Sequence, residues 1–192
     1  MRNVLIVLSS FFTIAAALPY ISDILKRKTK PRVVSWLIWA LLTGISAAAS
    51  LSDKQYAAFV LSLSASIECI AVVLLGLKYG DKDYSRLDIG CFAGAIIGLL
   101  LWYIFDSPSI AILAGIIIDL VGAVPTISHA WIDPFEETWM TFAMSAIGAV
   151  FAVLAATTVR VTSLANPIYI VIINMILTSV IITRQRKTRA SS

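Results

Sequence analysis

ALPYIS, at residues 17–22, returns as AVPTIS at residues 123–128, an offset of 106 residues. The same offset places Glu68 on Asn174, and the long apolar stretches of the two halves then begin and end together. A fixed offset that respects such boundaries is typical of an internal repeat, and many transporters are built from repeats of this kind. The sequence therefore predicts two structurally related halves.

The composition assigns the chain to the membrane proteins. Of its 192 residues, 59% are hydrophobic and 14% are charged, and the mean hydropathy is +0.92. A soluble domain carries about 25% charged residues, and disordered chains are poor in hydrophobic residues. Soluble enzymes and disordered proteins are therefore excluded, and we expect an all-α, polytopic membrane protein in which each spanning helix takes about 20 residues.

Polar breaks divide the apolar sequence into seven predicted transmembrane helices. They cover about residues 4–22, 33–51, 55–77, 87–105, 109–131, 138–158 and 163–183. Three helices fall in each half and one is left between them. Four helices, an even number, therefore precede the second repeat, so both repeats enter the membrane from the same side and are parallel. The predicted organisation is a first triple-helix repeat at 1–80, a linker helix at 81–106 and a second triple-helix repeat at 107–192.

The basic residues predict the direction of these helices. Twelve of the fifteen fall on one predicted side of the membrane: Lys26, Arg27, Lys28, Lys30, Arg32, Lys78, Lys82, Arg86, Arg184, Arg186, Lys187 and Arg189. Only Arg2, Lys54 and Arg160 fall on the other side. Loops rich in Lys and Arg stay in the cytoplasm. We therefore expect a multi-pass protein of the cell membrane with its N-terminus outside and its C-terminus in the cytoplasm.

Two acidic residues lie in the middle of predicted membrane helices, Glu68 in the third and Asp119 in the fifth. An ionised carboxylate is costly in hydrocarbon, so such a residue faces a cavity or a partner, or holds a proton. One interpretation is a role in proton coupling for both acids. The other is a side chain that is protonated or solvated and only bonds nearby backbone.

Asn174 takes the place of Glu68 in the second repeat, so we expect the two side chains to face each other across the pseudo-two-fold axis. They would form a polar site with one neutral and one titratable member, suited to binding a substrate. The alternative is that Asn174 only links neighbouring helices.

Pro19 and Pro125 fall inside predicted helices, where proline removes a backbone hydrogen bond and bends the chain. They are predicted either as hinges for alternating access or as static kinks. The acidic loop around residues 133–137 lies on the same predicted side as two basic loops, 26–32 and 78–86. We expect ion pairs between these loops to form an inner gate.

The layout resembles the SWEET and PQ-loop transporters, a superfamily with two triple-helix repeats, a linker helix and an external N-terminus. Each repeat there has a proline near the end of its first helix, followed by a short polar loop. Pro19 before the basic loop and Pro125 before Trp131-Ile132-Asp133-Pro134 are similar to this pattern, although the Pro-Gln pair of the family reads Pro19-Tyr20 and Pro125-Thr126 here. The resemblance implies transport by alternating access. It also implies a substrate-binding asparagine on the third helix of each repeat, which Asn174 matches and Glu68 replaces.

No enzyme motif appears, such as a nucleophile elbow, a metal-ligand spacing or a phosphate-binding glycine loop. We therefore expect no enzymatic activity, no cofactor, no metal and no nucleic acid. The predicted function is secondary transport of a small polar solute, sugar-like or amino-acid-like, with proton coupling. The alternative is a membrane receptor, sensor or structural partner of the same fold. The expected partners are the solute and the lipid bilayer, and a homo-oligomer is allowed.

Overall fold

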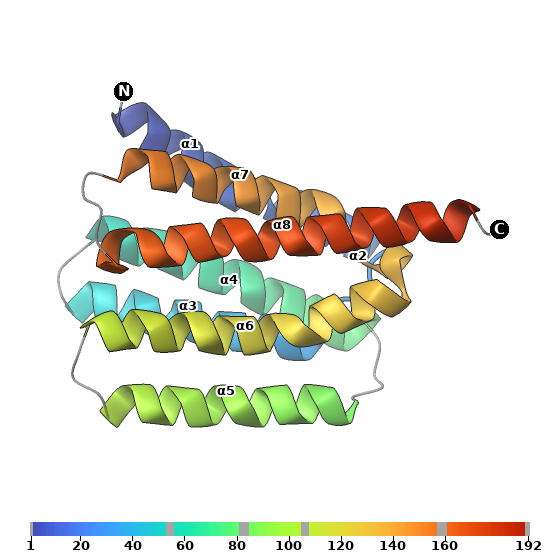
Figure 1. Cartoon of the computed structure of the whole chain (residues 1–192), viewed down its shortest axis with the longest axis horizontal. Helices are drawn as coiled ribbons and strands as arrows, with labels where there is room; N and C mark the ends of the chain where they lie inside the picture. The colour runs from blue at the N-terminus through green and yellow to red at the C-terminus, as the bar shows by residue number, and fades with distance from the viewer. Residues whose placement is uncertain (1, 53–55, 81–84, 105–107, 157–160, 191–192) are drawn as a thin grey trace.

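The computed structural model describes residues 2–52, 56–80, 85–104, 108–156 and 161–190, and every element in these ranges is a helix. The elements are α1 (Arg2–Ala15), α2 (Ala17–Leu25), α3 (Val33–Ser52), α4 (Tyr56–Tyr79), α5 (Arg86–Ile104), α6 (Pro108–Ile132), the 3-10 helix η1 (Pro134–Glu136), α7 (Trp139–Ala155) and α8 (Val161–Ala190). Because Ala16 alone separates α1 from α2, these two form one bent rod, and the described chain makes seven long rods (Figure 1). The all-helical prediction is confirmed.

Three of the described helical stretches are long and apolar enough to cross a membrane: Arg2–Leu25, Leu113–Ile132 and Leu164–Ala190. Shorter apolar helical stretches cover Val33–Ile45 and Trp139–Ala155. These lengths and compositions are compatible with a membrane location. Three basic residues used to predict the direction of the chain, Lys54, Lys82 and Arg160, lie outside the described residues.

The two prolines of the repeat have different effects on their helices. Pro19 has no N–H to donate to the carbonyl of Ala15, and α1 ends at Ala15. Pro125 lies inside α6, which continues through it to Ile132. The rod that contains Pro19 is therefore interrupted, whereas the rod that contains Pro125 is not.

Local polar contacts define where two other helices begin and end. At the start of α5, Asp88 N donates to Ser85 Oγ over 3.2 Å, and Ser85 N donates to Asp88 Oδ2 over 2.7 Å. This reciprocal capping box satisfies two backbone donors of the first turn.

At the other end of the chain, α8 continues seven residues beyond the predicted Thr183. Its last turns are held by Arg184 Nε, which donates to Trp131 O over 2.8 Å, and by a bond from Gln185 Nε2 to Pro134 O.

Successive rods run in alternating directions between the two ends of the bundle (Figure 1). One end, called the basic end below, holds loop 26–32, the segment 133–138 and the last turns of α8. The opposite end holds the N-terminus.

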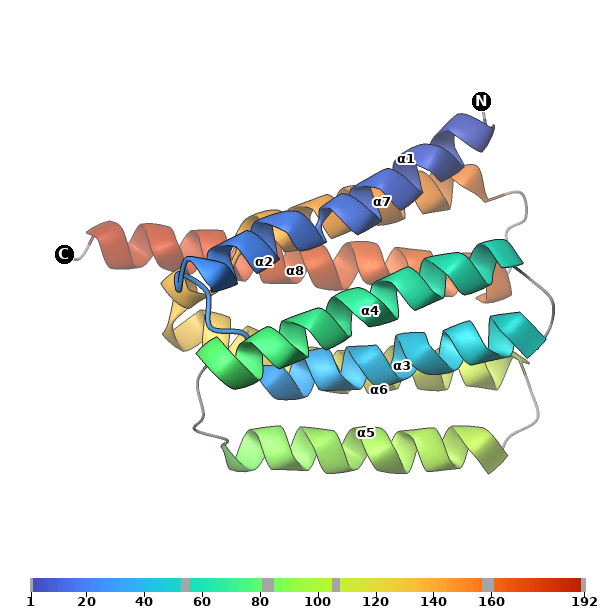
Figure 2. The same ribbon diagram turned by 180° about the vertical axis from the view of Figure 1, so that it is seen from behind.

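The rods pack both within each predicted repeat and between the two repeats. α1 packs on α7, and α3 packs on α6, while α3 also packs on α4 and α7 on α8. α5 lies at the edge of the bundle against α6 and α3 (Figure 2). Glycine permits a close approach of α1 to α7 and of α3 to α6. A Cβ on Gly148 would lie 2.8 Å from Thr13 Oγ1, and one on Gly122 would lie 2.9 Å from Ile38 Cγ2.

Candidate functional site

A cavity of about 340 Å³ lies inside the bundle, and residues from α1, α3, α4, α6, α7 and α8 line it. Among the described residues, the predicted linker α5 contributes nothing to this wall. The lining extends from Trp36 and Thr141, near the basic end, to Ser9, Ala152 and Asn166, which lie toward the opposite end. The cavity is thus lined jointly by the helices of the two predicted repeats.

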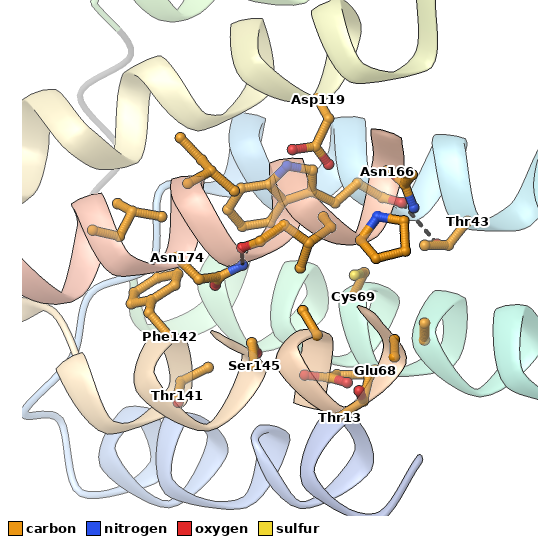
Figure 3. Close-up of a pocket in the computed structure, with 18 of the residues that line it drawn as sticks. Thr13, Thr43, Glu68, Cys69, Asp119, Thr141, Phe142, Ser145, Asn166 and Asn174 are labelled. Atoms are coloured by element: carbon orange, nitrogen blue, oxygen red, sulfur yellow. Dashed lines mark hydrogen bonds between the residues drawn. The ribbon is translucent and has the colours of Figure 1, made fainter. Parts of the chain in front are cut away.

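The three polar residues predicted from the sequence, Glu68, Asp119 and Asn174, all line this cavity. They come from α4, α6 and α8, and Figure 3 shows Asp119 and Glu68 on different sides of the cavity with Asn174 between them. Their separation in sequence is large, so the tertiary packing alone brings them together.

Each of the three makes a different set of bonds. Asp119 Oδ2 accepts a 2.6 Å hydrogen bond from Tyr169 Oη, whereas Glu68 makes no hydrogen bond or ion pair with any described residue. Asn174 Nδ2 donates over 2.9 Å to Ile170 O, one turn earlier in its own helix. Asn174 is therefore not bonded to another helix within the described part of the chain.

Tyr169 was not predicted. A tyrosine in an apolar helix is ordinarily a packing or interfacial residue, and only its position opposite Asp119 distinguishes it.

A cluster of four residues, called the closing cluster below, separates the cavity from the basic end: Tyr20, Trp36, Phe142 and Glu137. Tyr20 Oη donates a 2.9 Å hydrogen bond to Glu137 Oε2 and accepts one of 3.2 Å from Trp36 Nε1. The Tyr20 ring lies 4.7 Å from the Trp36 ring and 6.2 Å from that of Phe142. Because Trp36 and Phe142 also line the cavity and Tyr20 is fully buried, the cluster borders the cavity on the side of the basic end.

Glu137 is the acidic member of this cluster and is only 3% exposed. Its burial raises the pKa of the carboxyl from 4.5 to about 8, an effect that the Tyr20 hydrogen bond and the charge of Arg32 oppose and the charge of Glu136 reinforces. Its second oxygen, Oε1, has no hydrogen-bond partner among the described residues. Glu137 is therefore expected to hold its proton at neutral pH.

Contacts between loop 26–32 and the segment 133–138 surround the closing cluster. Lys30 forms an ion pair with Glu136, and its backbone N–H donates to Glu136 O over 2.9 Å. The hydroxyls of Thr29 and Thr138 are 2.6 Å apart, and Thr138 Oγ1 donates to Asp23 Oδ2 over 3.1 Å. The predicted ion pairing between the basic and acidic loops is confirmed for Lys30 and Glu136. Its role as a gate stays a prediction.

One group of side chains has the composition of a metal site. The ligand atoms of His129, Asp133 and Glu136 lie within 4.8 Å of one another at the basic end. Lys30 already pairs with the Glu136 carboxylate, and His129 Nε2 lies 3.5 Å from the same carboxylate. The positive charge of Lys30 in this group opposes the approach of a metal cation.

The predicted hinges lie outside the cavity wall: Pro125 is fully buried inside α6, and Pro19 follows the break at Ala16.

Neither a family model, nor a curated protein, nor a solved structure matches this chain.

Proposed function

We propose that this protein is a seven-helix membrane transporter of a small polar solute that works by alternating access. The single observation that carries the proposal is the cavity: it holds Glu68, Asp119 and Asn174 among apolar walls. Such polar groups in an apolar interior mark a solute site more often than a structural feature. The seven rods would span the membrane with the basic end in the cytoplasm.

The pairing of the helices supports the parallel repeat. Exchanging the two predicted repeats converts the contact of α1 with α7 into that of α6 with α3, and the contact of α3 with α4 into that of α7 with α8. Each of these four contacts is present in the bundle. Two similar halves that enclose a shared site are the parts that a rocking mechanism requires.

The closing cluster supports a cavity that is shut toward the cytoplasm. Tyr20 and Trp36 belong to the first predicted repeat, whereas Glu137 and Phe142 belong to the second. The hydrogen bond between Tyr20 and Glu137 therefore crosses from one half to the other on the inner side of the cavity. Opening toward the cytoplasm would require that bond and the Lys30–Glu136 contact to separate.

Flux into proteoliposomes tests this proposal. The purified chain would be reconstituted with internal sugars, amino acids or amines, and counterflow of each labelled solute would be followed with and without a pH gradient. We expect at least one solute to exchange, and Glu68→Gln to slow it while the exposed acid variant Asp133→Asn does not. If no solute of the three classes moves, the transport proposal is wrong. Binding of a solute without flux would favour the alternative function, a membrane receptor of the same fold.

Topology has its own test. A reporter fused after Ser192 is expected in the cytoplasm, and one fused before Met1 outside the cell. Reporters on the same side would contradict the odd number of spans.

A further inference from the structure

The charge of the cavity narrows the class of solute, an inference that rests on the proposed function because it concerns the same site. The described lining residues include two carboxylates, Glu68 and Asp119, and no lysine, arginine or histidine. This contrasts with the chain as a whole, whose formal net charge is +4. The interior site thus has the opposite sign to the protein that contains it.

The hydrogen bonds leave these carboxylates without a counter-charge from the described chain. Asp119 has a neutral partner, the hydroxyl of Tyr169 at 2.6 Å, and Glu68 bonds to no described residue. A carboxylate away from bulk water is costly unless it is paired with a cation or holds a proton. A ligand that brings its own positive charge would remove this cost, and a neutral or anionic ligand would not.

The aromatic walls favour an organic cation over a bare metal ion. Trp36, Trp39 and Phe142 line the same cavity, and the two tryptophan rings lie 5.2 Å apart at 81°. Aromatic rings attract ammonium groups through their negative faces, and tryptophan does so most strongly. The cavity of about 340 Å³ also exceeds by an order of magnitude the ~30 Å³ that a water molecule occupies.

We propose that this cavity binds a small organic cation, a primary amine or a quaternary ammonium compound, between the carboxylates of Glu68 and Asp119 and against the rings of Trp36 and Trp39. Figure 3 shows the two acids on different sides of the cavity, where each presents a negative charge to a cation bound there. If one acid is protonated in the empty cavity, arrival of the cation releases that proton to the solvent. The solute and the proton then exchange for each other at one site.

Matched pairs of probes test the charge requirement on the unmodified protein. Choline and 3,3-dimethylbutan-1-ol have nearly the same shape and differ in whether nitrogen or carbon bears the methyl groups, and benzylamine and benzyl alcohol form a second pair. Calorimetric titration of the purified protein in detergent is expected to show binding of at least one cation. Its neutral counterpart should bind at least about tenfold more weakly, because the ring attraction and the charge pairing are both lost. Equal binding within both pairs, or binding of no cation to folded protein, would overturn the proposal.

Substitution of the two cavity acids tests whether they supply the negative charge that binds the cation. Glu68→Gln and Asp119→Asn keep the shape of the side chain, and each is expected to weaken binding of the cation by about 30-fold or more, as removal of one partner from a buried charge pair does. Asp133→Asn makes the same charge change at an exposed position outside the cavity and should bind normally. If the cavity variants bind the cation as the control does, the two acids are not its counter-ions.

Flux measurements distinguish failure of the cation site from failure of the proposed transport function. A cation that binds selectively but does not cross the proteoliposome membrane would refute transport and retain the cation site. Counterflow of a sugar that excess choline and benzylamine do not slow would retain transport and refute the cation site.

Discussion

Tyr20 Oη donates a 2.9 Å hydrogen bond to Glu137 Oε2, although the two residues are 117 positions apart in the chain. Tyr20 is fully buried, Glu137 is nearly so, and both lie between the cavity and the basic end. The bond joins helix α2 to the segment that precedes α7. It is therefore a tertiary contact that joins the two predicted repeats near the basic end of the bundle.

Removing the hydroxyl of Tyr20 is expected to destabilise the fold. Tyr20→Phe leaves Glu137 Oε2 and Trp36 Nε1 without their present partner, and each unsatisfied buried group costs about 1–3 kcal/mol. Thermal unfolding in detergent would measure the loss. Phe142→Leu, which changes a ring contact but no hydrogen bond in the cluster, is the control for packing. An unchanged unfolding temperature in Tyr20→Phe would show that the bond contributes nothing.

Glu137 predicts how stability depends on pH. Burial raises its pKa from 4.5 in the unfolded chain to about 8 in the folded protein. Between these values the unfolded chain has lost the proton and the folded protein has kept it. The contribution of Glu137 is therefore complete below pH 4.5 and is lost as the pH rises to about 8.

Glu137→Gln cannot titrate, so it should flatten the dependence of the unfolding free energy on pH over this range. Glu136→Gln removes a neighbouring carboxylate that is less buried and should leave most of the slope. The same slope in Glu137→Gln and in the unmodified protein would assign the pH dependence to another group.

Two glycines separate close helix packing from helix propensity. A Cβ on Gly148 would meet Thr13 Oγ1 at 2.8 Å and Ser9 O at 3.1 Å, whereas a Cβ on Gly115 would meet nothing within 4 Å. Gly148→Ala is expected to cost about 1–3 kcal/mol by forcing α1 and α7 apart. Gly115→Ala should be neutral or stabilise by up to about 1 kcal/mol, since alanine is the better helix former. Equal unfolding temperatures in the two variants would contradict the close approach of α1 and α7.

The ion pair between Arg32 and Asp88 predicts a further loss of stability. Asp88 is 1% exposed, pairs with Arg32 and accepts from the N–H and hydroxyl of Ser85. Asp88→Ala is expected to cost about 3–5 kcal/mol, because it leaves a largely buried guanidinium without this counter-charge. The exposed Asp133→Ala is the matched control. Guanidinium chloride is unsuited to this measurement because it screens charge, so heat or a neutral denaturant should be used.

Much of the architecture could be predicted from periodic properties of the chain. The apolar stretches predicted the positions of the rods to within a few residues, because a long apolar stretch satisfies its backbone polar groups internally when it forms a helix. The main difference is α8, which runs to Ala190 instead of Thr183. Its basic last turns are held by Trp131 and Pro134, which belong to another part of the chain and leave no local signal.

Some residues of the candidate site could be identified from the sequence, and others only from the structure. The presence of Glu68, Asp119 and Asn174 in apolar stretches identified them as polar residues with a special environment, and the structure brings all three to one cavity. Tyr169, Trp39 and the closing cluster could not be identified beforehand. Aromatic residues are common in apolar helices, and only their neighbours in space show which of them meet an acid or line a cavity.

The sequence by itself determined that the chain is helical, where its helices lie and which polar residues are out of place among apolar ones. These are local properties, because hydrophobicity and helix length are summed along the chain. The tertiary structure alone decided that α1 meets α7 and α3 meets α6, and that a cavity with two acids remains between them. It also decided that Tyr20 meets Glu137 beside this cavity. Such pairings depend on side-chain shape across helices that are distant in sequence, which no local pattern records.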